Sequence, residues 1–314
     1  MISFGPVPSR RLGKSLGINN IVSPKICSYG CIYCQVGNTF KKSIEREVFF
    51  KPENILEKIE QHIQKLNKDS LPDYLTFVSN GEPTLDINLG KSIKLLKGTG
   101  ITVAVITNAS LIDNESVRED LNLADWVSLK IDAGDKDTWK KVNQPFQNLK
   151  FENILNGIRI FSNEFSGILC TETMLIEGKN DSAENVSIIS DFIKKLNPLK
   201  AYLSIPIRPP AHRSVKAPGA EIITRAWQIF IDKNINTELL TGFEGTGAGY
   251  TGNIYEDVLN ITAVHPLRED SMMELLQNNN ADFQVITSLI NQRLIRGTSY
   301  NGHKYYLREY HHNF

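Results

Sequence analysis

The sequence predicts an α/β protein whose core is a partial (β/α)6 TIM-like barrel, followed by a small C-terminal winged-helix-like appendage. Two observations predict the core. Apolar strand-like runs alternate with helical patterns along much of the 314-residue chain, which is typical of βαβ units and a parallel sheet. These runs number about six, fewer than the eight strands of a closed barrel, so the barrel is expected to be open.

The predicted elements follow one another in regular alternation. A helix is predicted at 52–66, where Pro52 stands at a helix start and the apolar residues fall on one face. Apolar and β-branched runs typical of buried strands follow at 74–78, 101–106, 126–131, 168–176 and 201–205. Helical patterns separate them near 88–97, at 151–163 and after the capping sequence at 181–184. One strand before the cysteines completes the predicted barrel.

The C-terminal part of the sequence does not continue the alternation of strands and helices seen in the core. The Pro-rich stretch 206–220 is expected to form a lid loop over the open face of the barrel. Further on, two short helical patterns precede two strand-like runs joined by Asn301-Gly302, a strong signal for a hairpin turn. The predicted domains are a core at 1–265, with an N-terminal extension and lid loops, and a winged-helix-like appendage at 266–314.

Composition excludes several classes of protein. The chain has 35 basic and 35 acidic residues, so no large field of one sign attracts nucleic acid or a membrane surface. No apolar run reaches the length of a membrane span, and the N-terminus lacks a signal-peptide pattern. We therefore expect a cytoplasmic protein whose cysteines are reduced.

Three of the four cysteines lie close together in the sequence. Cys27, Cys31 and Cys34 have the spacing C-x3-C-x2-C, which allows one loop to present three thiolates to a single centre. An iron–sulfur cluster or zinc is the natural ligand for such a site. No second cysteine pair or H-x3-5-H follows, which disfavours structural zinc. Cys170 stands alone in an apolar run and is expected to be a small buried hydrophobe, with a fourth cluster ligand as the alternative.

Polar residues gather where the predicted strands end. Gly81 and Glu82 follow the strand at 74–78, and Asn108 follows the next one. In parallel architectures such ends form one site. The following strand has polar residues at alternate positions, which places them on one face: Ser128, Lys130 and Asp132. Buried polar groups need partners, so they either bind a ligand or pair with each other, as Lys130 with Asp132.

The cysteine loop, with an aromatic residue, Tyr33, before the third cysteine, closely resembles that of the radical S-adenosylmethionine (SAM) superfamily. The segment Phe4-Gly-Pro-Val-Pro-Ser-Arg-Arg-Leu-Gly resembles the N-terminal signature of its wyosine-synthetase-like Fe–S oxidoreductases. The resemblance implies a [4Fe-4S] cluster on Cys27, Cys31 and Cys34, with one open iron that chelates SAM. It also implies reductive cleavage of SAM to a 5'-deoxyadenosyl radical and a reductant protein such as a flavodoxin or ferredoxin.

The resemblance also indicates which residues contact SAM. Gly81 and Glu82 match the Gly-Gly-Glu motif that binds its amino group, with Asn80 in place of the first glycine. The positions implied to bind the cofactor are Tyr33, Gly81, Glu82, Asn108, Ser128, Lys130 and Asp132, with Asn108 and Lys130 ranked above Asp132. No catalytic residue is assigned.

The reaction and the substrate stay open at this point. No cysteine precedes Cys27, whereas wyosine synthetase has a further N-terminal cluster, so a single cluster is predicted and the wyosine reaction is not transferred. Alternatives are a glycyl-radical activating enzyme and an Fe–S electron-transfer or redox-sensing DNA-binding protein. The tail carries cations interleaved with tyrosines, which is typical of RNA contacts: Arg293, Arg296, Lys304, Arg308, Tyr300, Tyr305 and Tyr306. Because winged-helix-like parts also contact proteins, RNA and protein are both candidate substrates.

Overall fold

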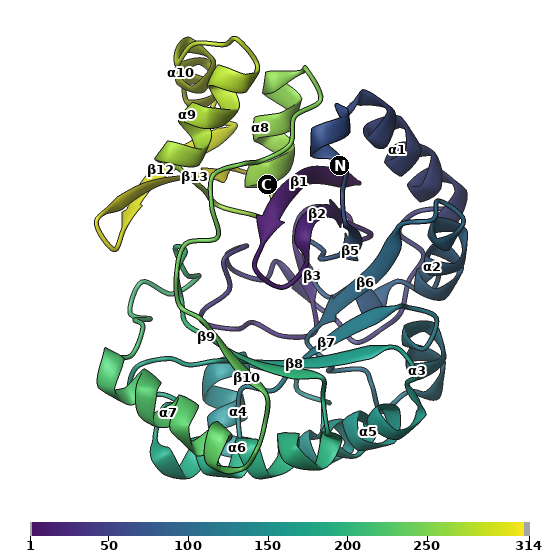
Figure 1. Cartoon of the computed structure of the whole chain (residues 1–314), viewed down its shortest axis with the longest axis vertical. Coiled ribbons are helices and arrows are strands. Elements are labelled where there is room, and N and C mark those ends of the chain that lie inside the picture. Colours follow the sequence, from purple (N-terminus) through teal and green to yellow (C-terminus); the bar gives the residue numbers. More distant parts are fainter. Residues whose placement is uncertain (1, 311–314) are drawn as a thin grey trace.

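A computed structural model describes residues 2–310. Its main element is a curled sheet of eight strands in the order β1-β2-β5-β6-β7-β8-β9-β10 (Figure 1). Their bounds are β1 (Ser3–Ser9), β2 (Gly13–Ile18), β5 (Tyr74–Phe77), β6 (Thr102–Thr107), β7 (Trp126–Lys130), β8 (Ile168–Met174), β9 (Lys200–Ser204) and β10 (Thr237–Leu240). All pairs from β2 to β10 are parallel, and β1 pairs with β2 in antiparallel fashion. The predicted partial barrel is therefore confirmed.

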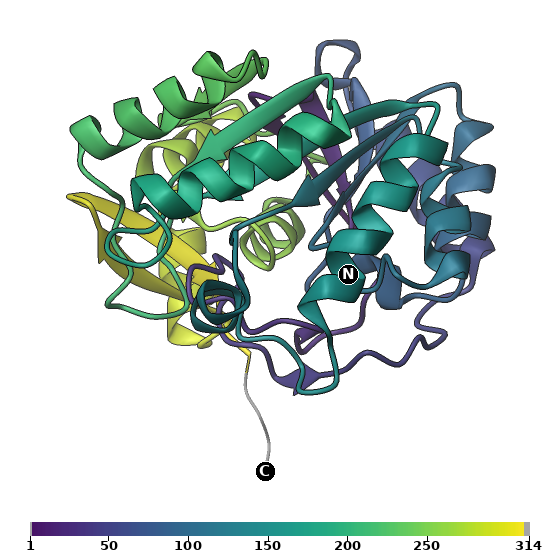
Figure 2. The same ribbon diagram turned by 90° about the horizontal axis from the view of Figure 1, so that it is seen from below.

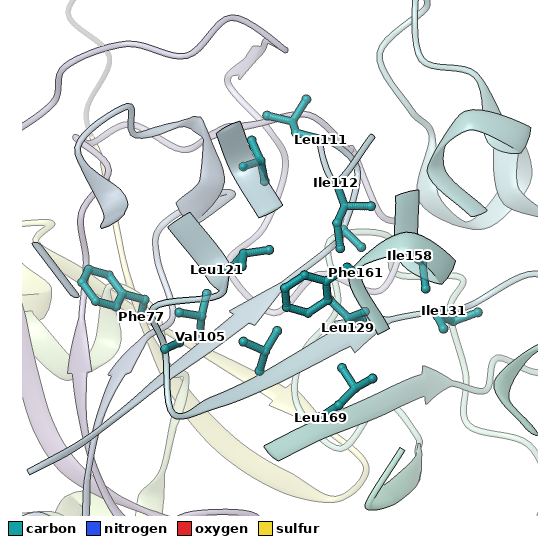
Figure 3. Packing of buried hydrophobic residues seen from close by; sticks show 14 of the residues in the cluster. Phe77, Val105, Leu111, Ile112, Leu121, Leu129, Ile131, Ile158, Phe161 and Leu169 are labelled. Carbon is teal, nitrogen blue, oxygen red and sulfur yellow. The ribbon is translucent and has the colours of Figure 1, made fainter. Parts of the chain in front are cut away.

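Helices cover the outer, convex face of the sheet (Figure 1). They are α1 (Pro52–Lys65), α2 (Leu89–Lys97), α3 (Glu115–Leu121), α5 (Phe151–Glu164), α6 (Ala183–Leu196) and α7 (Ala220–Asp232). The short helix α4 (Lys136–Asn143) packs instead against the segment that carries the clustered cysteines. Outward apolar residues of successive strands meet these helices, as Figure 3 shows for Val105 and Leu129 against Leu121 and Phe161. Short 3-10 turns lie at Lys68–Ser70 and Pro83–Leu85. Because apolar residues fill the convex side, the polar residues of the strands face the barrel interior.

The structure has more strands than the sequence patterns predicted. Residues 3–18 form the hairpin β1–β2 and not the single strand that was predicted. The sequence did not reveal two strands here, because Pro6, Pro8 and the glycines interrupt the strand pattern. The last strand, β10, is only four residues long and carries a glutamate, so no pattern predicted it. The tip of the β1–β2 hairpin reaches the strand at the other edge of the sheet, where Arg10 donates a hydrogen bond to the carbonyl oxygen of Leu239 in β10.

The C-terminal part combines three helices with a small sheet. Its elements are α8 (Ile254–Thr262), β11 (Leu267–Arg268), α9 (Glu269–Asn278), α10 (Gln284–Asn291), β12 (Ile295–Tyr300) and β13 (His303–Arg308), with strand order β11-β13-β12. The predicted hairpin turn at Asn301-Gly302 is present, and both residues have positive φ. The sequence patterns missed α8 and β11. The winged-helix resemblance and the boundary at 265 stay predictions.

The C-terminal part is not separate from the barrel. Phe4 and Val7 of β1 belong to the same buried apolar cluster as Val258, Leu275 and Tyr306. Tyr300 and Tyr305 donate hydrogen bonds to the carbonyl oxygens of Pro206 and Ile207, at 2.9 Å each, which fastens the β12–β13 hairpin to the loop after β9 (Figure 2). Within residues 2–310 no helix has the length and apolar composition needed to cross a bilayer.

Candidate active site

Most of the predicted site residues converge on one cavity of about 270 Å³ inside the barrel mouth. The three clustered cysteines line it, and the ends of β6, β7, β8 and β9 supply Thr107, Lys130, Met174 and Ser204. Of the positions predicted to bind the cofactor, Tyr33, Gly81, Glu82, Asn108 and Lys130 line this cavity. Ser128 and Asp132 are not among its lining residues.

The cysteine loop is anchored at both ends and in the middle. Cys27 ends the short strand β3 (Ile26–Cys27), which pairs with β4 (Lys41–Lys42) and so closes the loop. In the middle, the backbone N–H groups of Gly30 and Ile32 donate to the carbonyl oxygens of Asn143 and Val142, each at 3.0 Å. The C-terminal turn of α4 therefore holds the loop against the barrel.

Each clustered sulfur receives a hydrogen bond from a side chain on a different element. Asn108 Nδ2 donates to Cys27 Sγ at 3.5 Å, and Asn143 Nδ2 donates to Cys31 Sγ at 3.4 Å. Lys25 Nζ donates to Cys34 Sγ at 3.0 Å. Asn143 was missed by the sequence patterns, because it lies on a helix 112 positions away from its sulfur.

Burial controls the protonation of these thiols. It raises the pKa of Cys27 to about 11 and that of Cys31 to about 12. Burial opposes ionisation of Cys34 as well, but the charge and hydrogen bond of Lys25 lower its pKa overall. Soft metal centres bind cysteine as thiolate, so metal binding must release protons here.

The donor set fits an iron–sulfur cube. In residues 2–310 no three His, Cys, Asp or Glu side chains are placed to hold one metal ion together. A four-iron cube binds each cysteine through a different iron, so its thiolates need only surround a common space. Cys27, Cys31 and Cys34 do so as three soft donors on one cavity, with N–H groups directed at their sulfurs.

Gly81 lets two segments meet at the cavity wall. Its φ of +148° is a conformation that side chains rarely adopt, and a Cβ there would lie 1.7 Å from the carbonyl oxygen of Ile26. The backbone N–H of Glu82 donates to that same oxygen at 3.2 Å. The turn after β5 is thereby fixed against the strand that carries Cys27.

The Glu82 carboxylate joins the ends of two strands. It is 1% exposed. Its oxygens accept hydrogen bonds from Thr84 N at 3.1 Å, Thr84 Oγ1 at 2.7 Å, Thr107 Oγ1 at 2.6 Å and Asn108 N at 2.8 Å. Burial raises the pKa of this carboxyl even though these bonds favour the charged form. Glu82 therefore positions Asn108 beside Cys27.

Comparison with known proteins decides the family. The sequence pattern described as the Radical SAM superfamily matches residues 21–186, more than half of the chain. This chain belongs to the radical SAM superfamily. A relative, UPF0026 protein MJ1312 of Methanocaldococcus jannaschii, is 46% identical over 310 residues, which cover 98% of this chain and 96% of the relative.

Solved structures agree on the radical SAM fold. A radical SAM methyltransferase from Sphaerobacter thermophilus has a TM-score of 0.57 at 14% identity, covering 72% of this chain and 66% of that one. The neighbours also include TYW1, a wyosine synthetase, with a lysine–pyruvate adduct bound, at a TM-score of 0.46 and 17% identity, covering 95% of this chain and 82% of that one. The expected membership of this superfamily is confirmed by the match over residues 21–186 and by the relative that is 46% identical.

Lys130 takes part in a charged network of the radical SAM barrel that the sequence patterns did not reveal. Its Nζ lies 3.0 Å from Glu172 Oε1 and 5.0 Å from the ring centroid of Tyr33. Arg11, at the tip of the β1–β2 hairpin, donates to the other oxygen of Glu172, Oε2, and Ser204 Oγ donates to Oε1 at 2.9 Å. The alternative pairing of Lys130 with Asp132 is not what the structure shows.

Two cations therefore hold one buried carboxylate in the cavity wall. The Glu172 side chain is 6% exposed, against 17% and 19% for its partners. Burial alone would raise the pKa of this carboxyl, but Arg11 and Lys130 lower it to about 2. Lys130 and Glu172 lie directly opposite each other in the β7–β8 register. The sequence alone does not reveal this pair of opposite charges, because the pairing depends on how the two strands are aligned.

We expect Glu172→Gln to lower the free energy of unfolding by about 3 kcal/mol at pH 7, because it leaves two buried cations without a carboxylate. A carboxyl whose pKa falls on folding stabilises the folded protein above its unfolded pKa of about 4.3, and the effect is lost as pH falls towards 2. Urea titrations at several pH values should show the difference between wild type and variant shrinking below about pH 4.

The control for this prediction is Glu238→Gln. Glu238 also pairs with a lysine across neighbouring strands, at 2.7 Å from Lys200, but both side chains are about one-third exposed. We expect it to cost under about 1 kcal/mol. Equal costs for Glu172→Gln and Glu238→Gln would contradict the role of burial in the network.

Asp132 and Ser128 lie apart from the cavity for different reasons. Asp132 is buried and accepts hydrogen bonds from the Tyr33 hydroxyl, from Asn143 Nδ2 at 2.8 Å and from Met174 N at 2.9 Å. It therefore orients Tyr33 and Asn143. Ser128 is fully buried, and its Oγ has no hydrogen-bond partner among the described residues.

Proposed function

We propose that this chain is a radical SAM enzyme that holds a site-differentiated [4Fe-4S] cluster with Cys27, Cys31 and Cys34. When bound, the cluster supplies one electron for the cleavage of SAM into methionine and a 5'-deoxyadenosyl radical. The observation that carries the proposal is the convergence of the three cysteines with Gly81 and Lys130 on one cavity inside the barrel mouth. A reductant protein, such as a flavodoxin or ferredoxin, would provide the electron.

The chain's own groups suit the binding of SAM beside the cysteines. Gly81 lines the cavity, with its backbone held beside Ile26. The Lys130 ammonium can bind the SAM carboxylate, while Asn108 and Tyr33 supply polar groups on the same cavity. Glu82 lines the same cavity as a proposed contact of the SAM amino group, and it also holds the backbone N–H of Asn108 at 2.8 Å. Ser128 and Asp132 remain proposed contacts of lower rank, since neither lines the cavity.

The competing proposal of an electron carrier or redox sensor needs a fourth thiolate. Cys170 is 1% exposed and packs with Trp126, Tyr202 and Leu240 in an apolar cluster inside the barrel. It is not among the residues that line the cavity. This placement supports three cysteine ligands and an open iron.

We further propose a macromolecular substrate, RNA or protein, that the C-terminal part presents to the cavity. The hairpin β12–β13 is bonded to Pro206 and Ile207, which line the cavity. The expected stacking of bases needs correction at two of the three tyrosines, because Tyr305 and Tyr306 are 4% and 0% exposed and cannot receive a base, whereas Tyr300 is half-buried. The burial of these two tyrosines therefore favours a protein substrate, as for a glycyl-radical activating enzyme, over RNA.

The test is SAM cleavage. Anaerobically reconstituted protein, reduced with dithionite, should convert SAM to 5'-deoxyadenosine in an amount that depends on protein. A second arm adds bulk transfer RNA or soluble protein at two salt concentrations. If transfer RNA stimulates 5'-deoxyadenosine formation and the stimulation is weaker at the higher salt concentration, RNA is the substrate class. If a fully reduced, iron-loaded sample forms no 5'-deoxyadenosine, the proposal of a radical SAM reaction fails.

A further inference from the structure

Lys25 is a buried cation for which SAM binding provides no role. Its residue exposure is 6%, and it lines the cavity two positions before Cys27. Its Nζ donates to Cys34 Sγ at 3.0 Å and to the carbonyl oxygen of Gly37 at 2.8 Å. Burial of an ammonium is costly unless it has partners, so this contact with a sulfur requires an explanation.

The Lys25 contact differs from those at the other two sulfurs. Within residues 2–310 the side-chain donors to Cys27 and Cys31 are neutral amides, from Asn108 and Asn143, at 3.5 and 3.4 Å. Lys25 approaches its sulfur more closely and carries a full positive charge. Charge-assisted hydrogen bonds are about twice as strong as neutral ones. The electrostatic environment of the three cysteines is therefore asymmetric, with the positive side at Cys34.

We propose that Lys25 is a positioning residue that raises the reduction potential of the cluster through its charge and its hydrogen bond to Cys34. This inference rests on the proposed function, because it requires a cluster on Cys27, Cys31 and Cys34. One-electron reduction adds a negative charge to the cluster, and a nearby cation stabilises the reduced form more than the oxidised form. Hydrogen bonds to the cluster sulfurs act in the same direction.

Two properties of the site strengthen the effect of this charge. The ammonium is buried, so water and salt screen it weakly. Its attachment is also rigid, because the Lys25 carbonyl oxygen accepts hydrogen bonds from Phe40 N at 3.1 Å and Lys41 N at 3.2 Å. A fixed cation next to a ligand sulfur makes transfer of an electron from the reductant more favourable. Its removal should make the cluster harder to reduce.

A purely structural role is the alternative, since Lys25 also bonds Gly37 and could simply hold the loop together. A structural role predicts lost iron but an unchanged potential in whatever cluster remains. The reduction potential therefore separates the two roles, and it does not depend on measuring activity.

The experiment compares Lys25→Met, Lys25→Gln and Lys25→Arg with wild type after anaerobic reconstitution. Iron is counted, and the potential is measured by redox titration followed by electron paramagnetic resonance, without SAM. The control is Lys42→Met, because Lys42 lies in β4, which closes the same loop, and its ammonium donates to the carbonyl oxygen of Gln144 at 2.8 Å and not to a sulfur. Lys25→Met should shift the potential to more negative values, Lys25→Gln by less, and Lys25→Arg and Lys42→Met little.

Loaded Lys25→Met with the wild-type potential would overturn the proposal. If Lys25→Met holds no iron, the reduction potentials of Lys25→Gln and Lys25→Arg are compared instead. A lower potential in Lys25→Gln than in Lys25→Arg supports the proposal. Equal potentials, or a Lys25→Gln protein without iron, assign Lys25 a structural role only. A wild-type protein that binds no four-iron cluster refutes the proposed function instead, which distinguishes the two failures.

Discussion

Replacing any one of Cys27, Cys31 and Cys34 by alanine is expected to remove the cluster and abolish SAM cleavage. A cube left with two thiolate ligands is exposed to solvent and lost, since these clusters depend on cysteine thiolates. The fold should survive, because Cys31 and Cys34 are only half-buried, whereas the Cys27 variant should also lose some stability, since Cys27 belongs to the buried apolar core. The measurements are iron and sulfide content, far-UV circular dichroism and 5'-deoxyadenosine formation.

Cys170→Ala is the matched control for this prediction. It removes the fourth cysteine of the chain from an apolar cluster, which should cost about 1 kcal/mol of stability for a small cavity. Iron content and SAM cleavage should stay at wild-type levels. A Cys170→Ala protein without its cluster, or a Cys31→Ala protein that keeps about four irons, would show that the ligand set is wrong.

Gly81→Ala is expected to have the largest effect of any single methyl addition at the site. The new Cβ would overlap the carbonyl oxygen of Ile26 at 1.7 Å, at a φ of +148° that disfavours side chains. Separation of the two segments and backbone strain should together lower the free energy of unfolding by about 3 kcal/mol or more. Because Ile26 precedes Cys27, iron loading should fall as well. Thermal unfolding and iron counting measure both effects.

Gly178→Ala separates backbone strain from the close contact. Gly178 also has positive φ, +63°, but a Cβ there would meet no atom within 4 Å. We expect a cost of about 1 kcal/mol and full iron loading. Similar losses of stability and iron in the two variants would mean that the approach of Gly81 to Ile26 does not shape the site.

The sequence predicts the parts of this molecule that depend on local spacing. The alternation of apolar runs predicted the parallel sheet, and the C-x3-C-x2-C spacing predicted the cysteine loop. Period-two alternation correctly placed Ser128 and Lys130 on one strand face, with Trp126 of the same strand inside the barrel. It placed Asp132 there as well, but Asp132 follows the end of β7 and faces Tyr33 instead.

The features that escaped prediction depend on contacts between distant segments. Arg11 and Glu172 are 161 positions apart, and Asn143 is 112 positions from Cys31. No spacing rule joins such residues, because the hairpin tip brings Arg11 to Glu172, and the packing of α4 on the cysteine loop brings Asn143 to Cys31. For the tail tyrosines, in contrast, the sequence pattern predicted a function that their burial does not allow. Aromatic residues among cations can stack on bases, but here Tyr306 belongs to the buried core of the C-terminal part, and Tyr305 is buried with its hydroxyl bonded to the carbonyl oxygen of Ile207.

The central claim is that three cysteines leave one iron of the cluster open to SAM. Electron paramagnetic resonance of the reduced, reconstituted protein, frozen with and without SAM, tests it most directly. The account predicts the signal of a reduced four-iron cluster that changes when SAM is added, because SAM binds the open iron. A cluster signal identical with and without SAM would mean that protein ligands complete the cluster, and it would contradict the account.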